Sequence, residues 1–293
     1  MNDQKLRQPI DRADHLRADP EALSALMGKR ARLLVLDDLE PRLDESERLT
    51  WSSLADAPAD AELIFLGLDG DRGCFAAVPR KPLKPSGNPL NTAAWKLKPD
   101  DFAIYTGARS LVDWHDRHRH CPRCGAGTVL AKGGWERDCA NSDCGAQHFP
   151  RTDPVTIMLI ENAKTGHVLL GRGKGWPERR FSALAGFVEP GETIEQGVAR
   201  EVMEEAGLPV RDVRYISSQA WPFPSQLMIG CIALSDHEAI TVDKTELDEV
   251  RWFTRGEVMA AKEGRTDAPF IMPPSFAIAH HLLIHWLDET ADG

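Results

Sequence analysis

Four of the six cysteines lie within 24 positions near the middle of the chain, and this cluster constrains the fold more than any other feature. They form two pairs, Cys121 with Cys124 and Cys139 with Cys144, joined by a short glycine-containing stretch. Two pairs at this spacing can place four thiolates at the corners of a tetrahedron around Zn²⁺. Because four thiolates fill the coordination shell, we predict a structural zinc ribbon with one zinc ion per chain.

Other interpretations of the cysteine segment stay open. The cysteines could be reduced core thiols or a redox pair, and His118 or His120 could replace one of them as a ligand. Zinc ribbons often bind nucleic acid, so a non-catalytic nucleic-acid module is a further alternative. The remaining cysteines, Cys74 and Cys231, lie in apolar stretches and are predicted to be inert core thiols.

The ribbon divides the 293 residues into three predicted domains: a β-rich N-terminal domain over 1–116, the ribbon over 117–149 and a third domain over 150–293. In the first domain, apolar runs at 32–36, 62–66 and 74–78 predict strands, and helical spacing follows from 101 to about 118. The proline-rich stretch 79–89 predicts a loop.

The third domain mixes strands and helices, which predicts an α+β fold with helices packed on a sheet. The expected strands are 155–160, 166–170, 182–187, 213–219, 226–234 and one around Trp252, and the expected helices are 194–206 and 275–288.

Charge and hydropathy exclude several classes of protein. The chain has 35 basic and 45 acidic residues, for a net charge of −10, which argues against a broad basic surface for nucleic acid. An acidic protein that binds anionic substrates usually needs divalent metal. The sequence contains no run of apolar residues long enough for a spanning helix, and its start is polar, so we expect a cytoplasmic protein without membrane contact.

The helix expected over 194–206 has clear signals at both ends. Thr193 with Gln196 forms a capping-box pattern at its start, and Gly207 predicts its end. An apolar stripe at every fourth position predicts a face packed on a core, and its members are Ile194, Val198, Val202 and Ala206.

Three glutamates crowd one edge of this helix. Glu201, Glu204 and Glu205 fall within an arc of about 100° beside the apolar stripe. Like charges at this spacing repel, and a bound divalent cation such as Mg²⁺ or Mn²⁺ would reverse that cost. A solvated acidic face is the simpler alternative, but Glu192 and Arg200 stand where they can pair and orient the carboxylates.

The segment 186–208 resembles the Nudix box, Gly-x5-Glu-x7-Arg-Glu-apolar-x-Glu-Glu-x-Gly-apolar, at every specified position. The resemblance implies an α/β/α sandwich and metal-dependent hydrolysis of a nucleoside diphosphate linked to another group. It also implies that Glu201, Glu204 and Glu205 bind the metal together with the Gly186 carbonyl. Glu192 and Arg200 would be an orienting pair, and Glu205 or Glu246 the general base, with Glu246 a further acidic position of the metal site.

The run from Ser218 to Gln226, SQAWPFPSQ, is similar to the SQPWPFPxS array of the NADH pyrophosphatase subgroup, with Ala220 in place of a proline and Gln226 in place of the final serine. FPRTDP at 149–154 resembles that subgroup's entry to the Nudix domain, with Phe149 for tyrosine. By this resemblance the substrate pocket would be lined by Phe187, Gln219, Trp221, Phe223, Ser225 and Ala279.

The subgroup resemblance implies hydrolysis of NADH or NAD⁺ to AMP and the nicotinamide mononucleotide, removal of NAD caps from RNA 5′ ends, and a homodimer. Two alternatives stay open. The chain could be an ADP-ribose or broad dinucleotide pyrophosphatase, or a Nudix ligand sensor without catalysis. Such a sensor would be expected to lose box glutamates, and all three are present.

Overall fold

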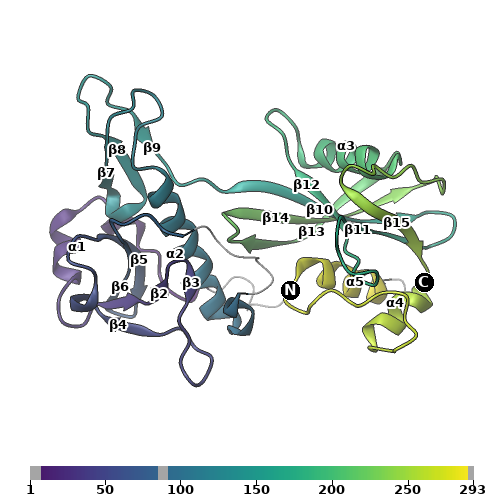
Figure 1. Cartoon of the computed structure of the whole chain (residues 1–293), viewed down its shortest axis with the longest axis horizontal. Helices are drawn as coiled ribbons and strands as arrows, with labels where there is room; N and C mark the ends of the chain where they lie inside the picture. Colours follow the sequence, from purple (N-terminus) through teal and green to yellow (C-terminus); the bar gives the residue numbers. More distant parts are fainter. Residues whose placement is uncertain (1–7, 85–91, 290–293) are drawn as a thin grey trace. The chain divides into compact units, whose positions relative to one another are not determined.

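The computed structural model describes residues 8–84 and 92–289, so part of the predicted loop 79–89 lies outside the described residues. The chain forms two compact units (Figure 1). The first comprises Met1–Thr152 with Trp221–Ser225, and the second Asp153–Ala220 with Gln226–Gly293. No helix in the described ranges is both long and apolar enough to cross a bilayer.

The first unit contains a small sheet covered by one long helix. Its strands are β1 (Arg32–Leu34), β2 (Leu36–Asp37), β3 (Glu40–Pro41), β4 (Trp51–Ser53), β5 (Glu62–Asp69), β6 (Arg72–Val78), β7 (Thr128–Ala131), β8 (Glu136–Cys139) and β9 (Gln147–His148). Its helices are η2 (Asp14–Leu16), α1 (Pro20–Leu26), η3 (Leu54–Asp56), η5 (Ala93–Lys96), α2 (Pro99–Arg117) and η6 (Lys132–Gly134), where η marks a 3₁₀ helix.

The main sheet of this unit has the strand order β4-β1-β6-β5, and α2 contacts β5 and β6. We expected one strand over the apolar run 32–36, and this prediction is wrong because the run forms parts of two strands. It divides at Val35, whose N–H donates to Thr50 O, and β2 then turns away to pair with β3. Tyr105 of α2 is fully buried and donates to Leu39 O, which ties the helix to the turn between β2 and β3.

A buried polar network joins the ribbon strands β7, β8 and β9 to the main sheet. Arg137 of β8 is 3% exposed and binds both carboxylate oxygens of Glu62 on β5, at 2.6 and 3.1 Å. Its Nη1 also donates to Nδ1 of His115 on α2, whose Nε2 lies 2.7 Å from Gly134 O. Burial lowers the pKa of His115 to about 4, so the ring is neutral and can accept from the guanidinium.

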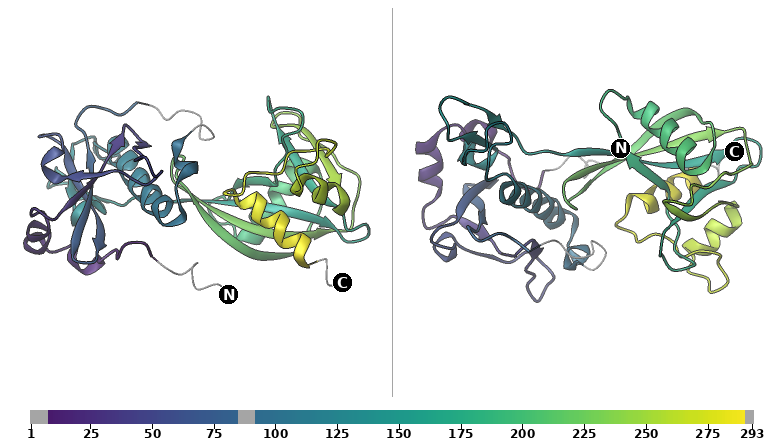
Figure 2. Two further views of the ribbon diagram at one scale, coloured as in Figure 1. Left: turned by 90° about the horizontal axis from the view of Figure 1, so that it is seen from below. Right: turned by 45° about the horizontal axis from the view of Figure 1, so that its top comes forward.

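The second unit is a mixed sheet with helices on both faces (Figure 2). Its elements are β10 (Asp153–Asn162), β11 (Val168–Gly173), β12 (Leu184–Phe187), α3 (Ile194–Ala206), β13 (Arg211–Trp221), β14 (Gln226–Ser235), β15 (Leu247–Phe253), α4 (Arg255–Lys262) and α5 (Ile278–Glu289). The strand order is β13-β14-β10-β11-β15, and β12 pairs with β10.

The central strand β10 shows how the two layers form. It is parallel to β14, and its side chains alternate between the faces. Ile157 and Leu159 join the core beneath α4 and α5, whereas Met158 and Ile160 join the core beneath α3. The predicted α+β architecture is therefore confirmed. The helix α4 was missed, although Thr254 and Glu257 form a capping box at its start, and α5 begins at Ile278, three residues later than expected.

Candidate active site

The carboxylate helix α3 is fixed at both ends and along one face. Thr193 Oγ1 accepts from Gln196 N at 3.3 Å, and Gln196 Oε1 accepts from Thr193 N at 2.8 Å, so the predicted capping box is confirmed. Val198, Val202 and Ala206 are fully buried against the sheet. The helix therefore cannot rotate, and the face that carries Glu201, Glu204 and Glu205 is set by packing.

Gly186 brings the strand β12 directly against Glu201. A Cβ atom at this position would lie 1.8 Å from Cδ of the Glu201 carboxylate. The Gly186 carbonyl accepts a 3.3 Å bond from Thr156 Oγ1 on β10. A glycine is thus required here because any side chain would displace the carboxylate from the strand.

Arg200 uses its guanidinium to hold the acidic groups around it. Two of its bonds go to Glu192, at 2.7 and 2.9 Å, which confirms the predicted pairing. Others go to Glu201 Oε1 at 2.8 Å, Glu204 Oε2 at 3.0 Å and Phe187 O at 2.8 Å. Hydrogen bonding to Arg200, with the Glu189 N–H as a second donor, lowers the pKa of Glu192 to about 2. The guanidinium therefore orients Glu201 and Glu204 directly as well as Glu192.

Glu205 is the most perturbed acid of the site. It is 6% exposed, and within the described part of the chain its Oε2 has no hydrogen-bond partner. Burial first, and then the nearby carboxylates of Glu201, Glu246, Asp243 and Glu204, together raise its pKa to about 8. An acid held in this way is costly unless a cation or a proton compensates the charge.

The loop that carries Glu246 is tied to the end of α3 by backbone hydrogen bonds. Thr241 N donates to Ala206 O at 2.8 Å, and Asp243 N donates to Glu205 O at 3.1 Å. These bonds bring Asp243 and Glu246 near Glu205. The sequence analysis included Glu246 but missed Asp243. Its place on the same loop, three residues before Glu246, could have indicated a second acid near the site.

The residues present fit a divalent cation. Several carboxylates converge on a buried oxygen without a partner, and all are hard oxygen donors of the kind that Mg²⁺ and Mn²⁺ prefer. Among the described residues, however, the four ribbon cysteines form the one compact group of potential metal ligands within 4.8 Å of one another. Arg200 holds Glu201 and Glu204, so the carboxylates would have to reorient to share an ion.

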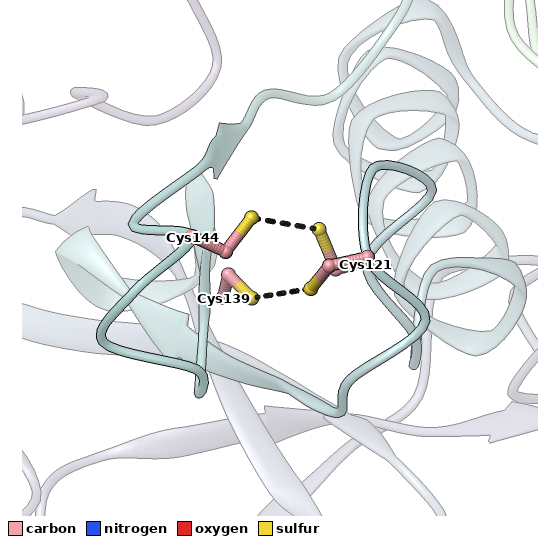
Figure 3. A group of neighbouring side chains, drawn as sticks. Cys121, Cys139 and Cys144 are labelled. Carbon is pink, nitrogen blue, oxygen red and sulfur yellow. Dashed lines mark hydrogen bonds between the residues drawn. The ribbon is translucent and has the colours of Figure 1, made fainter.

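The cysteine cluster has the geometry of a closed zinc site (Figure 3). Sγ of Cys121 lies 3.9 Å from that of Cys144, and Sγ of Cys124 lies 3.4 Å from that of Cys139. Four sulfurs around Zn²⁺ at about 2.3 Å would be separated by about 3.8 Å. Each second cysteine is followed by a glycine with positive φ, Gly125 and Gly145, which closes the tight turn. Hydrogen bonding to the Ala126 N–H lowers the pKa of Cys124 to about 7, which favours the thiolate.

Three family models match consecutive parts of the chain: an NADH pyrophosphatase-like rudimentary NUDIX domain at residues 26–114, an NADH pyrophosphatase zinc ribbon domain at 116–149 and a NUDIX domain at 150–272. The NAD-capped RNA hydrolase NudC of Mycobacterium tuberculosis is 40% identical over 298 residues, covering 96% of this chain and 93% of its own length. The chain belongs to the Nudix hydrolase family, in its NADH pyrophosphatase subgroup.

Mammalian members are also similar to this Nudix chain. NAD-capped RNA hydrolase NUDT12 is 38% identical over 288 residues in Macaca fascicularis and 40% identical over 253 residues in human. The matches cover 94% and 84% of this chain, but 59% and 52% of the relatives. The chain thus spans little more than half the length of these relatives.

In the second unit, three of the predicted substrate residues lie on different elements of the Nudix fold. Phe187, at the end of β12, is 52% exposed. Gln219 of β13 donates through Nε2 to Phe276 O at 2.5 Å and accepts from Ile278 N at 2.9 Å. Its amide therefore fixes the start of α5, where Ala279 is 3% exposed. Sequence reasoning placed Gln219 at the substrate and missed this anchoring contact.

The other predicted substrate residues belong to the segment Trp221–Ser225 of the first unit. The Trp221 ring lies 5.0 Å from that of Trp95, with an interplanar angle of 30°, and Phe223 lies 5.7 Å from Trp95. Arg109 lies over the Phe223 ring and donates to Pro222 O. We call Trp95, Phe102, Trp221 and Phe223 the aromatic cluster, because Phe102 also contacts Trp95. Ser225 Oγ donates to Arg151 O at 2.9 Å.

Proposed function

We propose that this Nudix hydrolase cleaves the pyrophosphate of NADH or NAD⁺ to give AMP and the nicotinamide mononucleotide. The observation that carries this proposal is Glu205, a buried acid with an unpartnered oxygen in a group of carboxylates. The NADH pyrophosphatase zinc ribbon match at 116–149 and the SQAWPFPSQ array support the dinucleotide as substrate. By similarity to the NAD-capped RNA hydrolases, we extend the proposal to NAD caps on RNA 5′ ends.

We assign the metal-binding role to Glu201, Glu204, Glu205 and Glu246 with the Gly186 carbonyl. A bound Mg²⁺ or Mn²⁺ would supply positive charge that neutralises the pyrophosphate and lowers the pKa of water. Water attacks one phosphorus, the bond from that phosphorus to the bridging oxygen breaks, and Glu205 or Glu246 takes the proton. Arg200 positions Glu201 and Glu204 before a cation binds, and Glu192 holds Arg200.

The residues expected at the substrate remain proposals of the same kind. Phe187, Trp221 and Phe223 offer aromatic faces for the base or the nicotinamide ring, and Ser225 and Ala279 offer polar or backbone contacts. Gln219 would act by placing the start of α5. The homodimer and the cytoplasmic location stay predictions, the first testable by light scattering of the purified chain.

The decisive experiment incubates the protein with NADH and either Mg²⁺ or Mn²⁺ and separates the products by chromatography. AMP and reduced nicotinamide mononucleotide are expected, and none should form when the divalent cation is omitted. Glu205→Gln should lose turnover by orders of magnitude. Glu195→Gln, an exposed acid on the same helix, is the matched control and should retain turnover.

Two outcomes would redirect the proposal. A much higher kcat/KM for ADP-ribose than for NADH would support Nudix hydrolysis with a different substrate. The protein would then be an ADP-ribose or broad dinucleotide pyrophosphatase. Tight dinucleotide binding without turnover of NADH, ADP-ribose or NAD-capped RNA would favour the sensor.

A further inference from the structure

The loop at 174–180, between β11 and β12, carries three cations that form no ion pair in the part of the chain that the structure describes. We call it the basic loop. Most arginines of this unit are in ion pairs, namely Arg172, Arg200, Arg211, Arg214, Arg251 and Arg265. In the described ranges, no carboxylate lies within 4 Å of the charged atoms of Lys174, Arg179 or Arg180, and Lys174 and Arg179 are exposed. Positions 174–180 hold these three cations and one exposed acid, Glu178, so the segment has a net charge of +2 in a chain of net charge −10. This local positive excess indicates an anionic partner.

We propose that the basic loop binds the RNA strand that follows an NAD cap. This inference rests on the proposed function for its biological substrate, but it concerns residues that the hydrolysis of NADH does not require. NADH brings two phosphates, whereas RNA adds one more with each nucleotide. The extra cations therefore match the part of a capped RNA that free NADH lacks.

The loop is held in one conformation by contacts at its beginning. Arg172 Nη1 donates to Trp176 O at 3.3 Å and to Asp248 Oδ2 at 3.1 Å, and Gly175 N donates to the same Asp248 oxygen at 3.1 Å. A Cβ atom on Gly173 would lie 3.0 Å from the Trp176 indole, so the ring packs on the backbone here. A loop ordered in advance loses little entropy when it binds an extended strand.

The end of the loop is equally fixed. Ile271 N donates to Arg179 O at 2.8 Å, and Arg179 Nη2 donates to Ala268 O at 2.8 Å. Arg180 N donates to Pro177 O at 2.9 Å, which closes a turn. Arg179 keeps further N–H groups for a phosphate, since one of its nitrogens makes the contact with Ala268.

Trp176 and Arg180 form a surface suited to a nucleobase. The guanidinium carbon of Arg180 lies 4.6 Å from the centre of the half-buried Trp176 ring. Flat aromatic and guanidinium groups stack on bases without regard to sequence, and nearby cations track the backbone. This combination fits a single strand better than it fits an isolated anion.

The basic loop also begins beside the proposed catalytic carboxylates. Lys174 N donates to Glu246 O at 3.3 Å, and Glu246 is among the carboxylates that act on Glu205. A strand whose cap is held at these carboxylates can therefore reach the loop with the nucleotides next to the cap.

The test compares two double variants with equal change of charge. Arg179→Glu with Arg180→Glu reverses two charges of the basic loop, and Lys164→Glu with Lys262→Glu reverses two exposed charges elsewhere in the same unit. Lys164 lies in the turn before β11, and the basic loop starts at the other end of that strand. For each protein, kcat/KM is measured on NADH and on an NAD-capped oligoribonucleotide, and binding of the same oligoribonucleotide without a cap is measured by fluorescence anisotropy.

The loop variant should lower kcat/KM for capped RNA and the affinity for uncapped RNA at least tenfold, while NADH hydrolysis changes less than twofold. The control variant should leave RNA within twofold of the wild type. A second double variant, Arg179→Gln with Arg180→Gln, removes the two charges without reversing them and should perturb the fold less. It should reduce the slope of log affinity against log salt by about 1.4, since each contact to a single strand contributes about 0.7.

Each contrary outcome has a distinct meaning. An equal loss of kcat/KM on NADH would overturn the inference, because the cations would then act on the pyrophosphate. An equal loss of RNA binding in the control variant would also overturn it, because the effect would then come from the net charge of the protein. If the wild type cleaves NADH but neither binds uncapped RNA nor decaps, the basic-loop inference is wrong and the proposed hydrolysis stands. If RNA binding depends on the loop but NADH is not cleaved, the proposed function fails instead.

Discussion

Glu205→Gln should stabilise the metal-free protein while it abolishes hydrolysis. The pKa of Glu205 is raised from 4.5 to about 8, by burial first and then by the surrounding carboxylates. Below pH 4.5 the group is protonated in both the folded and the unfolded chain, so it costs nothing. Between pH 4.5 and 8 the unfolded chain releases the proton and the folded chain retains it, so the free energy of unfolding falls by about 1.4 kcal/mol for each pH unit.

Above pH 8 this loss levels off at roughly 5 kcal/mol. Glutamine carries no charge and avoids the loss, although its buried N–H groups cost about 1–3 kcal/mol if they find no partner. The variant should therefore be more stable than the wild type at pH 8 by about 2–4 kcal/mol. The advantage should disappear between about pH 5 and pH 7, where the loss equals the cost of the buried amide. Saturating Mg²⁺ should stabilise the wild type and narrow the difference.

Hydrogen exchange of the peptide that covers α3 is the suitable assay, because two units need not unfold together and a single midpoint could mix them. The protein is freed of Mg²⁺ by dialysis rather than with a chelator, so that the ribbon keeps its zinc. At pH 8, exchange in α3 should slow by between roughly 30-fold and 1,000-fold in the variant. Equal exchange at pH 8, or the same difference at pH 5, would refute the reasoning.

Four further outcomes are expected. Gly186→Ala should lower kcat about 100-fold or more with the fold intact, since the new methyl group displaces the Glu201 carboxylate; circular dichroism and steady-state kinetics check this. Cys144→Ser should reduce the zinc content from about one per chain to a small fraction, as measured by elemental analysis. Arg137→Met should destabilise the first unit by about 1–3 kcal/mol in urea, because it leaves the half-buried Glu62 and the buried His115 without their partner. Trp221→Ala should raise KM for NADH more than it lowers kcat, and an unchanged KM would count against stacking.

The features that could be predicted from the sequence are those set by local spacing. The limits of α3, its capping box and the pairing of Glu192 with Arg200 all follow from residues that are close together in the sequence, and the structure has them as expected. The cysteine pairs belong to the same class, since each turn closes on its own glycine.

The features that could not be predicted depend on contacts between distant positions. The residues next to Trp221 in the sequence do not indicate that its ring contacts Trp95. Those next to Glu62 do not indicate that it binds Arg137. The extra bonds of Arg200 to Glu201 and Glu204 depend on rotamers that spacing does not specify. Such contacts are selected by packing, which a one-dimensional pattern does not contain.

The segment Trp221–Ser225 has a consequence for how the chain folds during synthesis. About 70 residues separate it from the end of the first unit at Thr152, and a ribosome needs roughly 3 to 14 s to add them. During that interval Trp95 and Phe102 have emerged without the partners that complete the aromatic cluster. The N-terminal half therefore has an apolar surface exposed to chaperones and to other nascent chains until synthesis reaches Ser225, roughly halfway through the Nudix domain.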